Sequence, residues 1–141
     1  MVSTRPDWLD GDYPSYENLV ASWGYEVLSF DTTGFYQGDH EALLRDAGGR
    51  FGIAVIGYGS CSGCDSLEAA TPYTWDDDED PDWSPVVDLA ESLRDGVTWF
   101  NSGEDAAEWI DRKLDRDGTD WWPYDDEVVS VLKGYRDRVT S

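Results

Sequence analysis

The stretch HEALLRDAGGRFGIAVIGY, residues 40–58, decides how this chain folds. It contains two runs, His40–Asp46 and Arg50–Tyr58, separated by Ala47-Gly48-Gly49. A Gly-Gly pair readily supplies the positive φ angles that tight hairpins need. The pattern predicts two antiparallel strands joined by a short turn. The second is the most apolar strand of the sequence, with Phe51, Ile53, Val55 and Ile56.

The residues just before this hairpin predict a further strand. Residues 25–30 alternate in polarity, so we expect Leu28 and Phe30 to share one face of a sheet. Thr33-Gly34 is expected to form a turn, after which Phe35-Tyr36 would start another strand. The sheet should therefore contain three or four antiparallel strands.

A helix over residues 14–23 is expected ahead of these strands. Pro14 suits the first helical position, where its missing N–H costs nothing, and Gly24 can close the helix in a left-handed conformation. Residues 1–13 are expected to form an irregular arm. The apolar positions of the helix follow i, i+3, i+4, i+7 spacing, at Tyr16, Leu19, Val20 and Trp23.

The second half of the chain is predicted to be mostly helical. A short helix is expected over Asp65–Ala70, followed by a helix that Ser84 caps and that has Pro85 in its first turn. A β-like run follows at Val97–Phe100. We then expect a helix capped by Ser102 and stopped by Gly118, and a last helix that begins at Asp125 or Asp126. The last helix aligns Val128, Leu132, Tyr135 and Val139. Residues 1–141 are thus expected to form a single α+β domain, with an antiparallel three- to four-stranded sheet in the first half packed by helices mainly from the second half.

Net charge is the outlying property of the chain. The 31 Asp and Glu residues against 10 Lys and Arg give a net charge of −21, and the pI is about 4.1. Nucleic-acid binding needs a basic footprint, which this composition does not provide, and anionic membranes would be repelled as well. A negative field should instead speed encounter with a basic partner protein. A charged coat that keeps the protein soluble, or an origin in a high-salt organism, would also account for the acidity.

The acidic residues gather in two places in the second half. Residues 71–83 are expected to form an acidic loop, because six of the seven residues from Asp76 to Asp82 are acidic and repel one another. A second group surrounds the start of the last helix. The predicted partner-binding residues are Asp76, Asp77, Asp78, Glu79, Asp80, Asp82, Asp120, Asp125, Asp126 and Glu127.

Targeting signals are not evident. No apolar stretch approaches the roughly 20 residues that span a bilayer, and Met1–Asp12 lacks the basic and apolar regions of a signal peptide. We therefore expect a cytoplasmic protein whose two cysteines are reduced.

Those cysteines lie in the turn Gly57-Tyr58-Gly59-Ser60-Cys61-Ser62-Gly63-Cys64-Asp65. A C-x-x-C motif before a helix is typical of redox dithiols, although no βαβ unit precedes this one. Cys61 and Cys64 could also hold zinc together with His40 and a carboxylate, Asp65 or Asp39. The interpretation that we favour is a tight glycine-rich turn with small buried cysteines and no cofactor.

Catalytic motifs are hard to assemble from this sequence. His40 is the single histidine, so any nucleophile triad would depend on it as base. Acidic residues are too numerous to select a catalytic carboxylate pair. A partial calcium loop at 115–120 would place Lys113 and Tyr124 at ligand positions that they cannot fill. A non-enzymatic protein is expected.

Three parts of the chain resemble small uncharacterised proteins of actinobacterial bacteriophages and their hosts. They are the segment Tyr36–Asp39, the turn from Gly57 to Asp65 with the following Ser66-Leu67-Glu68, and the later helix–Trp99–helix pattern. No activity or site residue is carried over from that group. The resemblance implies a small phage protein that works in a bacterial cytoplasm.

Charge and resemblance together suggest one leading function. We expect an acidic interaction protein, a DNA mimic that offers carboxylates to a basic, nucleic-acid-binding host defence protein. The alternatives are a small metal-binding or thiol-redox protein centred on the C-x-x-C turn, and a virion accessory protein or an acidic domain shaped by solubility alone.

Overall fold

The structure of the protein, a computed structural model, describes residues 6–9, 15–34, 38–59, 65–72, 82–114 and 126–140. Within these residues lies a four-stranded antiparallel sheet in the order β1-β2-β3-β4, formed by β1 (Glu26–Gly34), β2 (Gly38–Arg45), β3 (Phe51–Tyr58) and β4 (Thr98–Phe100). The helices are α1 (Tyr16–Ala21), α2 (Ser66–Ala70), α3 (Ser84–Asp95), α4 (Gly103–Leu114) and α5 (Asp126–Thr140). The predicted single α+β domain is confirmed.

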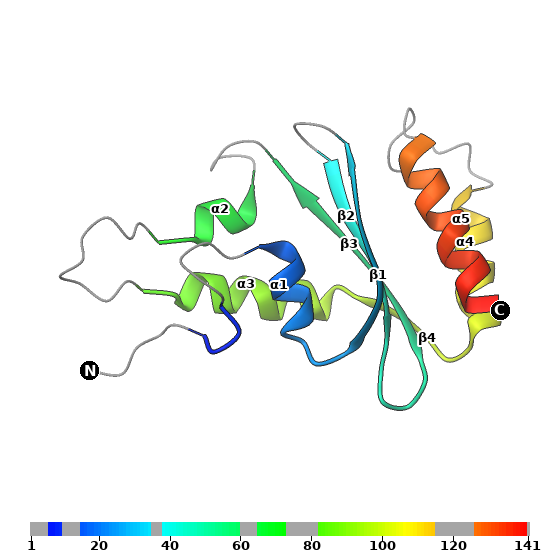
Figure 1. The fold of residues 1–141 in the computed structure, drawn as a ribbon, viewed down its shortest axis with the longest axis horizontal. Helices are drawn as coiled ribbons and strands as arrows, with labels where there is room; N and C mark the ends of the chain where they lie inside the picture. The colour runs from blue at the N-terminus through cyan, green and yellow to red at the C-terminus, as the bar shows by residue number, and fades with distance from the viewer. Residues whose placement is uncertain are drawn as a thin grey trace.

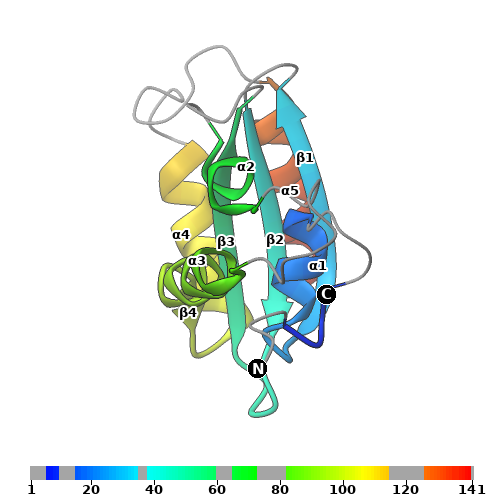
Figure 2. The ribbon, with the colours of Figure 1, turned by 90° about the vertical axis from the view of Figure 1, so that its left-hand side faces the viewer.

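Helices cover both faces of the sheet, which is the middle of three layers (Figures 1 and 2). The layer of α1, α2 and α3 encloses the α1–α3 core, made of Leu9, Tyr16, Leu19, Val20, Ala42, Leu44, Ala54, Ile56, Leu67, Trp83, Val86, Ala90 and Val97. The layer of α4 and α5 encloses the α4–α5 core, made of Leu43, Ile53, Phe100, Ala106, Ala107, Ile110, Val128, Leu132, Tyr135 and Val139. Both cores draw on β2 and β3, because successive side chains of a strand point to opposite faces.

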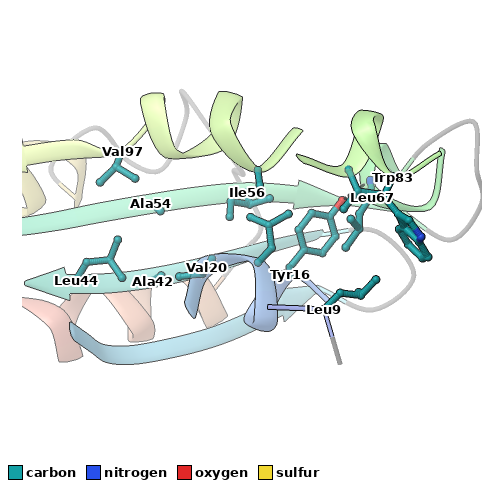
Figure 3. Packing of buried hydrophobic residues seen from close by; sticks show 13 residues of the cluster. Leu9, Tyr16, Val20, Ala42, Leu44, Ala54, Ile56, Leu67, Trp83 and Val97 are labelled. Atoms are coloured by element: carbon teal, nitrogen blue, oxygen red, sulfur yellow. Dashed lines mark hydrogen bonds between the residues drawn. The ribbon is translucent and has the colours of Figure 1, made fainter. Parts of the chain in front are cut away.

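Figure 3 shows how the α1–α3 core is assembled. Ala42 and Leu44 from β2 lie beside Ala54 and Ile56 from β3, and Val20 of α1 covers them. The small alanines let helices approach the sheet closely, so the core is continuous from strand to helix.

The β2–β3 hairpin forms as residues 40–58 predict. The backbone N–H of Asp46 donates to the carbonyl of Arg50 at 3.0 Å, and that of Gly49 donates to the carbonyl of Asp46 at 3.1 Å. Gly49 has φ of 87°, a left-handed conformation that a residue without Cβ adopts at no steric cost. The glycine-containing turn is confirmed.

β1 runs further than predicted and includes Thr33 and Gly34. Thr33 pairs with Asp39 across the β1–β2 ladder and is only 1% exposed. The predicted turn at Thr33-Gly34 is therefore wrong, because strand pairing and the burial of a β-branched side chain outweigh the turn preference of Gly34. Phe35-Tyr36, expected to begin a strand, lie outside the described residues.

A β-bulge interrupts the alternation of β1. The register shifts between Val27 and Ser29, so that Leu28 is the extra residue. Leu28 packs against the α4–α5 core, whereas Phe30 packs against the α1–α3 core. The prediction that Leu28 and Phe30 share a face is wrong, because one inserted residue reverses the alternation of every side chain beyond it.

α1 is shorter than the helix predicted over 14–23. Ser15 caps it, with Oγ accepting the backbone N–H of Asn18 at 3.1 Å. Trp23 lies beyond the helix end, where its Nε1 donates to the carbonyl of Ala90 in α3 at 3.0 Å. Gly24 follows with φ of 84°, the left-handed conformation that the sequence predicts.

The caps of α3 and α4 differ in how well they were predicted. The predicted cap at Ser84 is wrong by one position, because Trp83 is the cap residue of α3 and Ser84 is the first residue of the helix. The N–H of Ser84 donates to Oδ1 of Asp82 at 3.0 Å. Trp83, at the end of the predicted acidic loop, is 1% exposed and anchors that end in the α1–α3 core. Ser102 caps α4 as predicted, with Oγ accepting the N–H of Asp105 at 3.1 Å. α5 buries the four residues predicted to align, Val128, Leu132, Tyr135 and Val139.

Candidate functional site

Aromatic side chains surround His40 on β2. The centroid of its imidazole ring lies 4.7 Å from that of Tyr58, 4.9 Å from that of Tyr16 and 5.2 Å from that of Phe30. These rings come from β3, α1 and β1, so three separate elements meet on one histidine. We call His40, Tyr16, Phe30 and Tyr58 the His40 cluster.

His40 is held in this cluster as a half-buried, hydrogen-bonded imidazole. Its Nδ1 lies 2.9 Å from Oγ1 of Thr32 on the neighbouring strand. Burial lowers the pKa of His40 below its ordinary value of 6.5, and the negative charge of Asp65 offsets only part of that effect. The structure thus favours a neutral His40 at pH 7.

Asp65 caps α2 and ties that helix to α1 and β3. Its Oδ1 accepts the hydroxyl of Tyr16 at 2.8 Å and the N–H of Glu68 at 3.0 Å, and its Oδ2 accepts the N–H of Gly59 at 3.0 Å. Burial alone would raise the pKa of Asp65, but these hydrogen bonds outweigh it and lower the pKa. Asp65 is therefore a charged helix cap with both oxygens engaged.

The predicted metal site falls only partly within the described residues. His40 and Asp65 lie at the same end of the sheet, linked through Tyr16, whereas Cys61 and Cys64 lie outside the described residues. In the described part of the chain, no three His, Cys, Asp or Glu side chains are grouped to hold a metal ion. Of the predicted metal ligands at this place, the described residues include His40 and Asp65, and both carboxylate oxygens of Asp65 already accept hydrogen bonds.

Asp39, the other carboxylate considered for that site, points away from it. Asp39 and His40 are neighbours on β2, so their side chains lie on opposite faces of the sheet. Asp39 is 5% exposed on the side covered by α4 and α5. It cannot join His40 around one ion.

A second polar group is buried between β1, β2 and α5, and no sequence motif predicted it. Oγ1 of Thr33 donates to Oε1 of Glu41 at 2.8 Å, and the hydroxyl of Tyr135 lies 2.8 Å from both Oδ2 of Asp31 and the carbonyl of Glu41. Burial, together with the nearby carboxylate of Asp31, raises the pKa of Tyr135, so the hydroxyl remains a donor. In the sequence, this buried polar group is indicated by two acidic residues at alternate positions of β2, Asp39 and Glu41.

An open pocket of about 340 Å³ lies beside β3. None of its described lining residues is charged, so these residues offer no charged acid, base or ligand to a polar substrate. Its lining comes from all of the α1–α3 layer as well as from the strand, at Tyr16, Val55, Ile56, Gly57, Tyr58, Ser66 and Leu93.

The predicted partner-binding acids are mostly outside the described residues. Asp82 and Glu127 are exposed, and Asp126 begins α5. Hydrogen bonds from Ser84, the first residue of α3, lower the pKa of Asp82. Those outside the described residues are Asp76, Asp77, Asp78, Glu79, Asp80, Asp120 and Asp125.

Acidic side chains that the structure does describe line the outer sides of α3 and α4. Their spacing of three or four residues places them one above another on the helix surface. Within the described residues, the exposed carboxylates of α3 form no ion pair, whereas Asp111 of α4 binds Arg136 of α5 with 2.6 Å between Oδ1 and Nε. The exposed acids are Asp88, Glu91 and Asp95 on α3, and Glu104, Asp105 and Glu108 on α4.

Comparison with protein-family models, curated proteins and solved structures finds no match to this chain. None of the helices in the described ranges is both long and apolar enough to cross a membrane. The main structural features of the described residues are the three-layer α+β fold and the exposed acidic side chains on α3 and α4.

Proposed function

We propose that the protein is an acidic, non-enzymatic interaction protein that binds a basic, nucleic-acid-binding surface of a partner. The observation that carries the proposal is the net charge of −21, together with exposed carboxylates on α3 that form no ion pair within the described residues. Because exposed ion pairs contribute little to stability, leaving these carboxylates unpaired costs the fold little and keeps their charge available to a partner. The resemblance to phage proteins suggests that the partner is a bacterial defence protein and that this chain acts as a DNA mimic.

Helix geometry supports the likeness to DNA. Asp88, Glu91 and Asp95 are separated by three and four residues, so their Cα atoms rise by roughly 5 Å from one to the next. One strand of DNA places a phosphate about every 3.4 Å along its axis. The row of carboxylates is therefore less dense than a row of phosphates, but it likewise presents negative charge in a line that can displace counterions from a basic cleft. The acidic residues of 76–80 and of 120–127 are expected to add to this charge.

Affinity capture tests the proposal. The full chain is immobilised, exposed to bacterial lysate, and washed at about 50 mM and about 200 mM salt, and retained proteins are identified by mass spectrometry. We expect basic nucleic-acid-binding proteins, retained at the lower salt and released both by the higher salt and by duplex DNA. Retention of no basic protein, or retention indifferent to salt and to DNA, would contradict the proposal.

A variant set separates patterned charge from total charge. Asp88→Asn, Glu91→Gln and Asp95→Asn together remove three charges from one side of α3. The matched control, Glu17→Gln, Glu26→Gln and Asp137→Asn, removes three exposed charges from α1, β1 and α5. We expect the α3 variant to lose more of the captured partner than the control. Equal losses would show that the charge acts only as a diffuse coat.

A metal-binding or thiol function at Cys61 and Cys64 is the second candidate. The observation in its favour is that Gly59 and Asp65, which flank the motif, are hydrogen-bonded to each other beside the His40 cluster. Elemental analysis of untagged protein tests it. Stoichiometric zinc that is lost in Cys61→Ser would support this function, and protein without bound metal would count against its zinc form.

A further inference from the structure

β3 extends well beyond the strand that pairs with its outer side. β4 pairs only with Phe51–Ile53, while β3 continues to Tyr58. Within the described residues, no strand pairs with residues 54–58 on the side away from β2. As far as the structure describes the chain, the edge of β3 is therefore unpaired over five residues.

The hydrogen-bonding pattern shows which backbone groups face outward at this edge. The N–H of Asp46 donates to the carbonyl of Arg50, which makes this a hydrogen-bonded pair of the hairpin. Hydrogen-bonded and non-hydrogen-bonded pairs alternate along an antiparallel ladder. The even-numbered residues of β3 therefore bond to β2, and Val55 and Gly57 direct their N–H and C=O groups away from it. Among the described residues, no backbone hydrogen bond outside the ladder involves Val55 or Gly57.

The open pocket lies along this same edge. Val55, Ile56, Gly57 and Tyr58 of β3 line it, together with Leu93 of α3. An added strand would thus find outward-facing backbone groups together with a recess for a side chain.

The other outer strand, β1, is less suited to strand addition. It carries the bulge at Leu28, and bulges are a common means by which sheets discourage pairing at an edge. The β2–β3 register contains no such shift. The edge without a bulge is therefore that of β3.

Charge indicates what would occupy this edge. α3 and α4 pack against β3 from its two faces, and both carry exposed acids on their outer sides (Figure 2). A second copy of this chain would bring another 21 negative charges to the same place and be repelled. We propose that residues 54–58 of β3 accept an extended basic segment of the partner as an additional strand. This inference rests on the proposed function in one respect, the basic character of the partner.

Position 57 provides a matched pair of variants. A Cβ at Gly57 would meet Oδ1 of Asp39 at 3.7 Å and the carbonyl of Gly38 at 4.0 Å, which are ordinary contacts. Gly57→Ala should fold normally and keep the outward N–H. Gly57→Pro removes that N–H at an edge position that tolerates proline, and its ring blocks an incoming strand.

The probe is a synthetic peptide of alternating lysine and valine, titrated against the full chain. We expect Gly57→Ala to bind the peptide with the affinity of the unmodified protein. Gly57→Pro should bind it with an affinity lower by a factor of about ten or more. Equal binding by all three proteins would overturn the inference. Circular dichroism and urea unfolding check that the proline variant is folded.

Backbone methylation of the peptide gives a second test that needs no variant. In an added strand only alternate N–H groups face β3. N-methylation of the lysines or of the valines should therefore abolish binding in one peptide and spare it in the other. Binding that is indifferent to both changes would be purely electrostatic, and would overturn strand addition while leaving the proposed function standing.

Light scattering tests whether a second copy of this chain occupies the edge of β3. A dimer that Gly57→Pro dissociates would show that a second copy takes the edge, contrary to the inference. If Gly57→Pro and one of the N-methylated peptides weaken binding of the lysine–valine peptide as expected, but the affinity capture fails, the edge is supported as a basic-strand site and the proposed function is contradicted.

Discussion

Among single residues, Tyr16 connects several separate elements. Its ring lies 4.9 Å from His40 on β2, its hydroxyl donates to Asp65 at 2.8 Å, and the same oxygen accepts the N–H of Leu67 at 3.1 Å. It is 7% exposed, and burial raises its pKa, so it stays protonated. One side chain thereby fixes the start of α2 relative to the sheet.

Tyr16→Phe should lower the free energy of unfolding by about 1–3 kcal/mol. The substitution keeps the ring but removes the hydroxyl that accepts the buried N–H of Leu67 and donates to the carboxylate of Asp65. Urea unfolding measures the change. The control is Tyr25→Phe, whose hydroxyl makes no hydrogen bond within the described residues, and which should change stability by less than about 0.5 kcal/mol. Equal effects of the two variants would contradict this role of Tyr16.

His40 should make the protein less stable as the pH falls below about 6.5. Because burial places the folded-state pKa below the unfolded value, the unfolded chain binds more protons between the two pKa values. The free energy of unfolding therefore decreases as the pH falls through that window, and levels off below the folded-state pKa.

The measurement is the unfolding free energy between about pH 7.5 and about pH 5 for the unmodified chain and for His40→Gln. His40 is the single histidine, so the difference between the two pH profiles isolates its contribution. A glutamine variant with the same slope in this window would show that other groups cause the pH dependence.

At the level of elements, α4 and α5 pack against each other as well as on the sheet. A Cβ built at Gly103, the first residue of α4, would overlap the carbonyl oxygen of Val139 in α5. Close backbone contact at this point requires a glycine. Gly134, in the middle of α5, has nothing within 4 Å of such a Cβ.

Gly103→Ala and Gly134→Ala should therefore change stability in opposite directions. The first forces α4 away from α5 and should cost about 1–3 kcal/mol, as overpacking does. The second replaces an exposed glycine inside a helix and should stabilise by about 0.5–1 kcal/mol. Thermal and urea unfolding of both proteins measure the changes, and a shared sign would contradict the helix contact described here.

At the level of the whole molecule, 21 excess negative charges repel one another across a small domain. Within the described residues, the side-chain ion pairs Arg50–Asp46 and Arg136–Asp111 offset little of this. Such self-repulsion destabilises the compact state and is screened by salt, with a Debye length of about 10 Å at 0.1 M.

The unfolding free energy should therefore rise as salt increases from about 50 mM to about 200 mM. The variant Asp88→Asn, Glu91→Gln, Asp95→Asn should show a smaller rise, because part of the repulsion is already removed. Urea unfolding at each salt concentration measures both slopes. Stability that falls with salt would mean that attractive ion pairs, rather than repulsion, dominate the surface.

Local features of the fold were predictable from the sequence. The apolar stripe of α5, the cap at Ser102 and the left-handed Gly24 and Gly49 were all predicted, because each depends on residues within a few positions of one another. The bulge at Leu28 was missed, because it is settled by pairing with β2.

For the candidate sites, the sequence indicated that His40 and Asp65 could meet, but not that Tyr16 would link them and occupy the carboxylate. It did not indicate the contact of Tyr135 with Asp31, 104 residues away. The acids of α3 were not singled out either, because the outward side of a helix is known only once its packing is known.

The fold class, the approximate position of each described element and the strongly anionic character of the protein could all be predicted from the amino-acid sequence. These follow from local periodicity, turn chemistry and composition. The contacts made in the folded chain set which residues surround His40 and which carboxylates are buried or exposed. They also set that β3, in the part of the chain that the structure describes, extends beyond its pairing with β4. Such features arise where segments distant in the chain meet, and contact between them is set by packing rather than by the order of the residues.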